Sequence, residues 1–284
     1  MMRIKGVDLS YCQEGISFPA LKQAGVKFAI IRAGFSTKKD VTMDRFVADC
    51  KKYGIAYGFY WYSYAMSVKQ AESEAEKCVD VIKGLSPTYP VFFDMEEKKQ
   101  ISSLNTDTRT KMAIAFCEKI RQAGFKTGIY ANPSFMEHYY DKSRIIGKYD
   151  IWLAHWTNSP DCPSRYDYGQ TMWQWGVDKI GGYDVDGDIC FTDYSSKTVD
   201  ELADEVLAGK WDNGAERERL LTAAGYDYNA VQKRINEKLY RKTVDEIANE
   251  VIAGLWGNGT ERKEKLTEAG YDYSAVQKRV NEML

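Results

Sequence analysis

Short apolar runs alternate with amphipathic segments through the first 150 residues of the chain. The apolar runs predict buried strands, and the segments with apolar positions at helical spacing predict helices. The predicted strands cover residues 4–10, 28–34, 55–64, 89–97 and 126–131, and the predicted helices cover residues 18–25, 44–53, 67–83, 106–123 and 134–140. Strands that alternate with helices in this way predict parallel pairing with crossover connections.

The rhythm changes after residue 150, because the predicted strands at 150–156, 171–175 and 184–191 have no amphipathic helix between them. The stretch that ends at Gln170 is rich in Pro, Asp, Ser and Tyr and is expected to be loop, and residues 177–183 are too few and too glycine-rich for a helix. Eight strands with helices between only the first five or six predict an α/β fold, an irregular β/α barrel. In such barrels catalysis takes place at the C-terminal ends of the strands.

The C-terminal part of the chain is a tandem repeat with an offset of 45 residues. Residues 197–239 recur as residues 242–284, with about thirty of the 43 aligned positions identical. The apolar positions in each copy predict three short helices, so each copy is expected to be a small three-helix bundle. The chain is thus predicted to consist of a barrel over 1–194 and two repeats, joined by short linkers at 193–197 and 240–241.

Composition excludes several classes of function. A net charge of −2 leaves no broad basic surface for nucleic acid, and no apolar run approaches the length that inserts in a membrane. The N-terminus leads directly into a strand, so no signal peptide is expected and the protein is predicted to be made in a cytoplasm. Six scattered cysteines without a C-x-x-C pair are predicted to be mostly buried free thiols, and the two distant histidines predict no metal site and no cofactor.

The strand within 89–97 ends in acid and places Asp94 and Glu96 on one face, because side chains at i and i+2 of a strand point the same way. Adjacent carboxyl groups in a partly desolvated site repel each other, so one can stay protonated near neutral pH and act as an acid. A solvated strand end or a helix N-cap would account for the same residues without chemistry. The other polar and aromatic residues near predicted strand ends are Asp8, Arg32, Tyr62, Tyr130, Trp156, Gln174 and Asp186. Four carboxyl groups would then line one bowl.

Three motifs in order along the chain, Gly6–Ser10 with Gln13, Phe93–Glu96 and Val185–Asp188, resemble those of the glycoside hydrolase family 25 muramidases, the Chalaropsis-type lysozymes. The D-x-E element also occurs in chitinase-like barrels, but the three motifs together are specific, and the resemblance covers roughly residues 3 to 194. The tail carries A-G-x-W-x-N-G and A-G-Y-D-Y in both copies and resembles the Cpl-7-type cell-wall-binding repeats of phage endolysins.

The resemblance implies a peptidoglycan hydrolase, a lysozyme that cleaves the β-1,4 bond between N-acetylmuramic acid and N-acetylglucosamine. It assigns Glu96 as the general acid, and Asp94 as the residue that orients the 2-acetamido group or stabilises positive charge on the sugar, with the nucleophile left open. Asp8 and Asp186 would complete the acidic ring, and their negative charges would raise the pKa of Glu96. Asp188 occupies a position where the family often has asparagine, and it is expected to be peripheral.

The candidate sugar-binding residues of the barrel are Tyr60, Tyr62, Tyr130, Trp152, Trp156, Trp173 and Gln174. About half of the aromatic ones are expected to pack the barrel wall, because strand alternation sends every second side chain outward. Tyr62 and Tyr130 are favoured, and Arg32 could pair with the carboxyl groups or form a buried structural pair. In the repeats, Trp211 and Trp256 could stack on sugars or fill the small cores. The other wall-binding candidates are Asp200, Arg217, Gln232, Asp245, Arg262 and Gln277.

Three alternatives stay open at this point: a glucosaminidase, a chitinase-like glycosidase, and a wall-binding protein that has lost catalysis. The intact set of four carboxyl groups favours an active enzyme, because clustered like charges are costly to keep. The expected partner is bacterial cell-wall peptidoglycan, on which two linked repeats would add avidity. The expected setting is that of an endolysin, which waits in a host cytoplasm until a holin opens the membrane.

Overall fold

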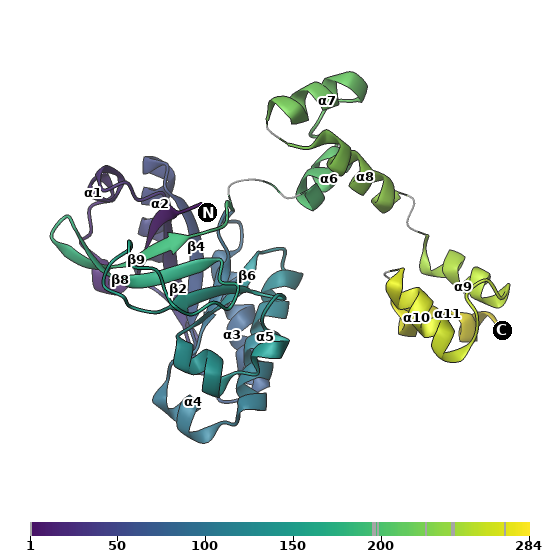
Figure 1. Cartoon of the computed structure of the whole chain (residues 1–284), viewed down its shortest axis with the longest axis horizontal. Coiled ribbons are helices and arrows are strands. Elements are labelled where there is room, and N and C mark those ends of the chain that lie inside the picture. Colours follow the sequence, from purple (N-terminus) through teal and green to yellow (C-terminus); the bar gives the residue numbers. More distant parts are fainter. Residues whose placement is uncertain (1, 195–196, 198, 225, 240–241, 270) are drawn as a thin grey trace. The chain divides into compact units, whose positions relative to one another are not determined.

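Two compact units, Met1–Ser196 and Lys197–Leu284, make up the chain in the computed structural model of the protein (Figure 1). The structure describes residues 2–194, 197, 199–224, 226–239, 242–269 and 271–284. Residues 195–196 and 240–241, which belong to the two predicted linkers, lie outside the described residues.

Within the described residues of the first unit, eight strands close a barrel and a ninth, two-residue strand lies beside it. The strands are β1 (Ile4–Leu9), β2 (Phe28–Phe35), β3 (Lys38–Lys39), β4 (Ala56–Tyr62), β5 (Val91–Asp94), β6 (Thr127–Ala131), β7 (Asp150–Ala154), β8 (Met172–Ile180) and β9 (Tyr183–Cys190). Their order is β1-β9-β8-β7-β6-β5-β4-β2-β3, and the pairing of β1 with β2 closes the barrel. The predicted irregular β/α barrel is confirmed.

Strand direction divides the barrel into a parallel part and an antiparallel seam. The pairs from β1 through β2, β4, β5, β6 and β7 to β8 are parallel. In contrast, β9 is antiparallel to both β8 and β1. The strand predicted to end at residue 175 continues to Ile180, and Gly181 and Gly182 turn the chain into β9 with φ values of +61° and +86°. Glycine adopts these values without strain, so the pair suits a tight hairpin turn.

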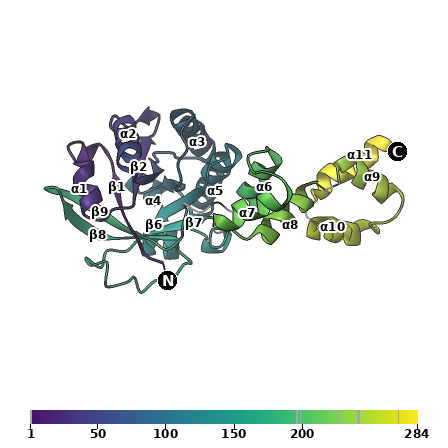
Figure 2. The same cartoon turned by 90° about the horizontal axis from the view of Figure 1, so that it is seen from above.

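Helices cover one side of this barrel. They are α1 (Phe18–Gln23), α2 (Met43–Tyr53), α3 (Val68–Ile82), α4 (Lys98–Ser103) and α5 (Thr106–Gln122). Figure 2 shows α1, α2, α3 and α5 along one side of the unit and the β8–β9 hairpin along the other. The short helix α4 was not predicted, and the helix expected over 134–140 is a π-helical turn over Phe135–Tyr139. The start of α4 is set by a capping box in which Glu97 and Gln100 bond each other's backbone.

The lower part of the barrel interior is filled by apolar and aromatic side chains, namely Phe28, Ile30, Tyr89, Phe92, Trp152, Met172, Cys190 and Tyr194. Gly6 adjoins this layer, and a Cβ atom there would lie 2.1 Å from the ring of Phe28, so a larger residue would displace the ring. A second, larger core packs the outward strand faces against the helices. Because the interior is filled below, its polar side chains gather at the C-terminal end of the parallel strands.

Each copy of the repeat folds into three helices, as predicted. The first copy has α6 (Val199–Leu207), α7 (Gly214–Ala223) and α8 (Tyr228–Leu239), and the second has α9 (Val244–Ile252), α10 (Gly259–Glu268) and α11 (Tyr273–Met283). Equivalent side chains fill the two small cores: Leu202, Val206, Leu221, Val231 and Ile235 in one, and Ile247, Val251, Leu266, Val276 and Val280 in the other.

None of the helices in the described part of the chain combines the length and the apolar character needed to cross a membrane.

Candidate active site

Asp8 and Asp186 face each other as register partners in the antiparallel ladder of β1 and β9. We expected both residues at C-terminal strand ends, and for Asp186 this is wrong, because it lies in the first half of β9. It reaches the same end of the barrel as Asp8 because β9 runs opposite to its neighbours. The seam therefore joins two carboxyl groups that are far apart in sequence.

Asp94 ends strand β5, and its register partners on either side are Tyr62 of β4 and Tyr130 of β6. The strand stops there, so Glu96 lies two residues beyond it and the pleat of the strand does not set its direction. Asp94 is buried, and its Oδ1 atom has no hydrogen-bond partner among the described residues, whereas the side chain of Glu96 is exposed. The two acids thus lie close together in different environments, one fixed in the barrel and one open to solvent.

Gln174 of β8 connects Asp8 with two aromatic residues. Its Nε2 atom donates a hydrogen bond to Asp8 Oδ2 at 2.8 Å, and its Oε1 atom accepts from Tyr130 Oη at 3.0 Å and from Trp156 Nε1 at 2.9 Å. Because both donors occupy Oε1, the amide nitrogen is the end that faces Asp8. Gln174 is only 3% exposed, so this orientation is held inside the barrel.

Burial raises the pKa of every acid in this group. The pKa values of Asp8 and Asp94 lie well above their usual range, first because of burial and next because of the charges of Asp186 and Glu96, respectively. The pKa of Glu96 is raised by loss of hydration first and then by the charges of Asp186 and Glu97. The predicted direction for Glu96 is therefore confirmed, but neighbouring charge is the smaller cause. An acid with such a pKa can carry a proton closer to neutrality.

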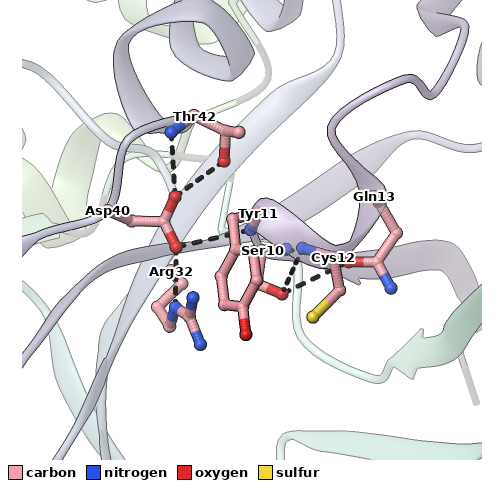
Figure 3. A network of polar contacts seen from close by, with 7 residues as sticks. All are labelled: Ser10, Tyr11, Cys12, Gln13, Arg32, Asp40 and Thr42. Atoms are coloured by element: carbon pink, nitrogen blue, oxygen red, sulfur yellow. Dashed lines mark hydrogen bonds and ion pairs between the residues drawn. The ribbon is translucent and has the colours of Figure 1, made fainter.

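Arg32 forms its ion pair with Asp40, so it takes the buried structural role, one of the two roles that the sequence left open. Its Nε atom lies 2.7 Å from Asp40 Oδ2, and Asp40 also accepts from the backbone and the hydroxyl of Thr42 and from the backbone of Tyr11 (Figure 3). The guanidinium lies 4.6 Å from the ring centre of Tyr11 and 5.2 Å from that of Phe35. Asp40 was missed in the sequence, although the Asp-x-Thr spacing before a helix is a recognisable turn signal.

Gln13, part of the first motif, shapes the end of β1. The Ser10 side chain accepts a hydrogen bond from the backbone of Cys12, and Gln13 Oε1 accepts from the backbone of Ser10 at 3.0 Å (Figure 3). This reciprocal capping starts a short helical turn directly after the strand. The cap residue Ser10 lies two positions after Asp8, so the motif ends β1 close to this acid.

The aromatic candidates divide between buried positions and the rim. Trp152 and Trp173 are both buried, but Trp152 fills the barrel interior, whereas Trp173 packs with Trp175 and Ile189 in a separate cluster. Tyr60 and Tyr130 are half-buried and contact Trp152 edge-on, with ring centres at 6.1 Å and 4.7 Å. Trp156 is 52% exposed at the rim.

Tyr62 donates to Glu97 Oε1 at 3.0 Å, an acid that the sequence did not single out. The same Glu97 caps α4, so the tyrosine is fixed from that helix. Sugar stacking by the aromatic residues stays a prediction.

Asp188 is not peripheral, contrary to expectation. It is fully buried, and its Oδ1 atom accepts a hydrogen bond from Trp152 Nε1 at 2.7 Å. Alternation along β9 places it on the face that carries Asp186. The prediction was wrong because an acid close to other acids near a strand end is usually solvated. In the structure the barrel encloses the side chain of Asp188.

The polar candidates of the repeats make contacts within their own modules. Arg217 donates to Asn213, to Gln232 and to the backbone of Asp212, and Arg262 makes the equivalent contacts with Asn258, Gln277 and the backbone of Gly257. Asp200 pairs with Arg234 at 2.5 Å, and Asp245 pairs with Arg279 at 2.7 Å. These contacts brace each bundle, and a role in wall binding stays a prediction.

The two tryptophans of the repeats are half-buried against the small cores. The Nε1 atoms of Trp211 and Trp256 donate to Glu205 and Glu250 at 3.0 Å each. The indole rings therefore contribute to packing, one of the two roles left open, and their polar edge is already bonded.

The carboxyl groups of the barrel form a site in which an exposed acid with a raised pKa, Glu96, adjoins the buried Asp94 and the facing pair Asp8 and Asp186. Paired carboxyl groups of this kind carry out acid-assisted cleavage of glycosidic bonds. No set of three His, Cys, Asp or Glu side chains in the described ranges is arranged to hold a metal ion.

Comparisons with known proteins bear on the family. The model of glycosyl hydrolases family 25 matches residues 7–180, and the model of the CW_7 repeat matches residues 200–239 and 245–284. The lysozyme of Streptococcus phage Cp-7 is 30% identical over 230 residues, which make up 76% of this chain and 65% of the phage protein. The chain thus spans slightly less than two thirds of that relative's length.

Solved structures have the same fold. The catalytic domain of endolysin ply40 from bacteriophage P40 of Listeria monocytogenes aligns with a TM-score of 0.56 at 26% identity, over 68% of this chain and 95% of that one. The modular autolysin LytC from Streptococcus pneumoniae, determined with a synthetic peptidoglycan ligand, aligns with a TM-score of 0.57 at 24% identity, over 66% of this chain and 47% of that one. The family model covers more than half of the chain, and the chain therefore belongs to glycosyl hydrolases family 25, with two CW_7 repeats in its C-terminal part.

Proposed function

We propose that this protein is a lysozyme of the N-acetylmuramidase type, which hydrolyses the β-1,4 bond between N-acetylmuramic acid and N-acetylglucosamine in cell-wall peptidoglycan. The observation that carries the proposal is the gathering of Asp8, Asp94, Glu96 and Asp186 at one end of the barrel of a family 25 chain. The similarity to the phage Cp-7 lysozyme supports it.

In this proposal Glu96 is the general acid that protonates the glycosidic oxygen as the bond breaks. Its side chain lies beyond the end of β5 and is exposed, so it can reach a bound polymer. Its raised pKa keeps the proton available closer to neutral pH. Burial is the first cause of this raised pKa, and the neighbouring Asp186 is the larger of the two charges that raise the pKa of Glu96 further.

Asp94 would orient the 2-acetamido group of the substrate or stabilise positive charge on the sugar ring. Its burial and its unpartnered Oδ1 atom support a role toward a ligand, because a free acceptor in the barrel is costly to leave unsatisfied. A substrate with a trifluoroacetamido group tests whether the acetamido oxygen is the nucleophile. It slows the reaction strongly in that case and only weakly where Asp94 stabilises the charge on the sugar.

The two C-terminal repeats would hold the enzyme on the wall. Their match to the CW_7 repeat supports peptidoglycan as the shared partner of both units. Two linked modules raise the local concentration of the barrel at its substrate without a tighter single site. An endolysin role, in which the wall is attacked after membrane opening, fits the relationship to phage enzymes.

Mass analysis of the fragments from digested, purified peptidoglycan tests the proposal. After chemical reduction of the new ends, a muramidase yields fragments that end in reduced N-acetylmuramic acid. Fragments that end in reduced N-acetylglucosamine would instead make the protein a glucosaminidase, and faster cleavage of chitin oligomers would make it chitinase-like. Binding to walls without any fragment would make it a catalytically dead wall-binding protein.

A further inference from the structure

We propose that Asp188 is a positioning residue, a neutral carboxylic acid in the barrel that donates a hydrogen bond to Asp8 and keeps Asp8 ionised. Its contribution to catalysis rests on the proposed function, whereas its protonation state does not. The proposal explains a fully buried acid that the four-carboxylate mechanism does not use.

The register of β9 with β1 and β8 places Asp188 next to the hydrogen bond between Gln174 and Asp8. Strand β9 lies between β1 and β8, and Asp188 is opposite Gly6 on one side and opposite Gln174 on the other. Gly6 has no side chain, and the ring of Phe28 lies where its Cβ would be. Asp8, two residues further along β1, is the diagonal neighbour of Asp188 across the ladder. The hydrogen bond from Gln174 to Asp8 spans the width of β9 at this point.

The hydrogen bonds of Asp188 leave one oxygen unexplained if the group is charged. Oδ1 accepts from Trp152 Nε1, but Oδ2 is buried without a donor among the described residues. A buried carboxylate with an unsatisfied oxygen is strongly disfavoured. A proton on Oδ2 removes this cost, because it turns the unpaired acceptor into a donor that bonds the carboxylate of Asp8.

The groups that face Asp188 act in the same direction. Asp8 approaches from β1, Asp186 and Cys190 lie on its own strand, and the neutral Trp152 and Gln174 approach from β7 and β8. Burial raises the pKa of Asp188 well above its usual range, and the charge of Asp8 raises it further. Burial and the charge of Asp186 raise the pKa of Asp8 well above its usual range, and the hydrogen bonds from Gln174 and Asp188 act against this rise.

The consequence is a division of charge within the acidic group. The donors from Gln174 and Asp188 both stabilise the ionised form of Asp8 and oppose the burial that raises its pKa. An ionised Asp8 disfavours the loss of a proton from Glu96, because like charges repel. Asp188 would thus act on the general acid through Asp8 without touching the substrate.

Infrared difference spectroscopy of the full-length protein tests the protonation directly. At pH 7 the wild type is expected to have the carbonyl band of a protonated carboxylic acid that Asp188→Asn lacks. The matched control is Asp184→Asn, an exposed acid on the same strand, which is expected to lose only carboxylate bands. Loss of a carboxylate band in Asp188→Asn would overturn the proposal, whether or not the protein cleaves peptidoglycan.

A pair of variants tests the positioning role. Asp188→Leu fills similar space but cannot donate, so kcat/KM on peptidoglycan is expected to fall on the order of 10- to 100-fold. The acidic limb of its pH profile should move to higher pH, because Asp8 loses a donor and its pKa rises. Asp188→Asn keeps an N–H donor and should restore both the rate and the position of the limb.

The outcomes separate the two proposals. If Asp188→Asn is as impaired as Asp188→Leu, a charge at this position matters and the inference is wrong. If Asp188→Leu does not fold, the infrared comparison of wild type with Asp188→Asn decides. If the wild type has no activity on any peptidoglycan, the proposed function fails while the infrared result still decides the state of Asp188.

Discussion

Gln174 and Asp8 are separated by 166 positions in the sequence and joined by a 2.8 Å hydrogen bond inside the barrel. The same amide accepts from Trp156 at the exposed rim, so one side chain connects a surface where a polymer could lie with a buried acid of the site. A ligand that moves Trp156 would therefore act on the orientation of Asp8 through a single residue.

The first prediction concerns the general acid. Glu96→Gln should lower the rate of peptidoglycan cleavage by about 10²- to 10⁴-fold, because the amide cannot give a proton to the leaving oxygen. The side chain is exposed, so the midpoint of thermal unfolding should hardly change. Turbidity clearing and circular dichroism on the same samples measure both quantities.

The adjacent Glu97 provides the matched control for that variant. Glu97→Gln loses the contact with Tyr62 and part of the cap of α4, but it leaves the proposed acid in place. It should therefore keep far more activity than Glu96→Gln. Equal losses in the two variants, or full activity in Glu96→Gln, would remove Glu96 from its role.

The second prediction concerns the stability of the protein when Asp94 is replaced. Asp94→Asn should raise the free energy of unfolding by roughly 1–3 kcal/mol at alkaline pH, because it removes a buried charge with an unpartnered oxygen. The raised pKa sets the sign: the folded state holds its proton longer than the unfolded chain, so ionisation at rising pH destabilises the wild type.

Urea unfolding at pH 5 and pH 9 measures this effect, and the gain should be larger at pH 9. Asp44→Asn is the control, since Asp44 is exposed and pairs with Lys39 at the surface. If Asp94→Asn is less stable than the wild type at pH 9, burial of the charged Asp94 is not the cost that this prediction assumes.

The third prediction uses Glu74, a buried acid of α3 outside the proposed reaction. It is 6% exposed, Oε1 accepts from the backbone of Tyr64, Oε2 has no partner among the described residues, and burial raises its pKa to about 7. Between the ordinary glutamate value and pH 7 the folded state binds more protons than the unfolded state. Stability should therefore fall as pH rises through this window and level off above about 7.

Glu74→Gln should remove this part of the pH dependence and exceed the wild type in stability above pH 7. Thermal unfolding midpoints between pH 4 and pH 9 provide the measurement. Glu76→Gln, on the exposed face of the same helix and paired with Lys119, should leave the dependence unchanged. Parallel curves for wild type and Glu74→Gln would mean that Glu74 does not titrate in this range.

The fourth prediction concerns the repeats. Arg217→Ala and Arg262→Ala should each destabilise their own module by roughly 1–3 kcal/mol, because each guanidinium bonds a loop carbonyl and two side chains. Chemical unfolding followed by helical circular dichroism measures the loss. Arg219→Ala, which removes only a surface pair with Glu216, should have little effect. An equal effect at Arg219 would contradict the bracing role.

Much of the fold and part of the site could be predicted because the signals are local. Alternation and helical spacing give the strands and helices of the barrel, and the fixed offset of the tail gives two three-helix copies. Asp94 could be singled out because it ends an apolar strand, and Asp8 and Asp186 because they belong to the motifs that resemble family 25. The short helix α4 was not predicted, because its six residues are mostly polar and show no helical spacing of apolar positions.

The sequence alone determined the family motifs, the order of the elements and the acids available for chemistry, since each of these is written in neighbouring residues. Only the tertiary structure decided which residues meet. Strand β9 runs antiparallel to its neighbours, which brings Asp186 opposite Asp8. Arg32 forms its ion pair with Asp40, and Asp188 is buried where it accepts a hydrogen bond from Trp152. These outcomes depend on strand register and on burial, which arise when distant segments pack and which no local pattern records.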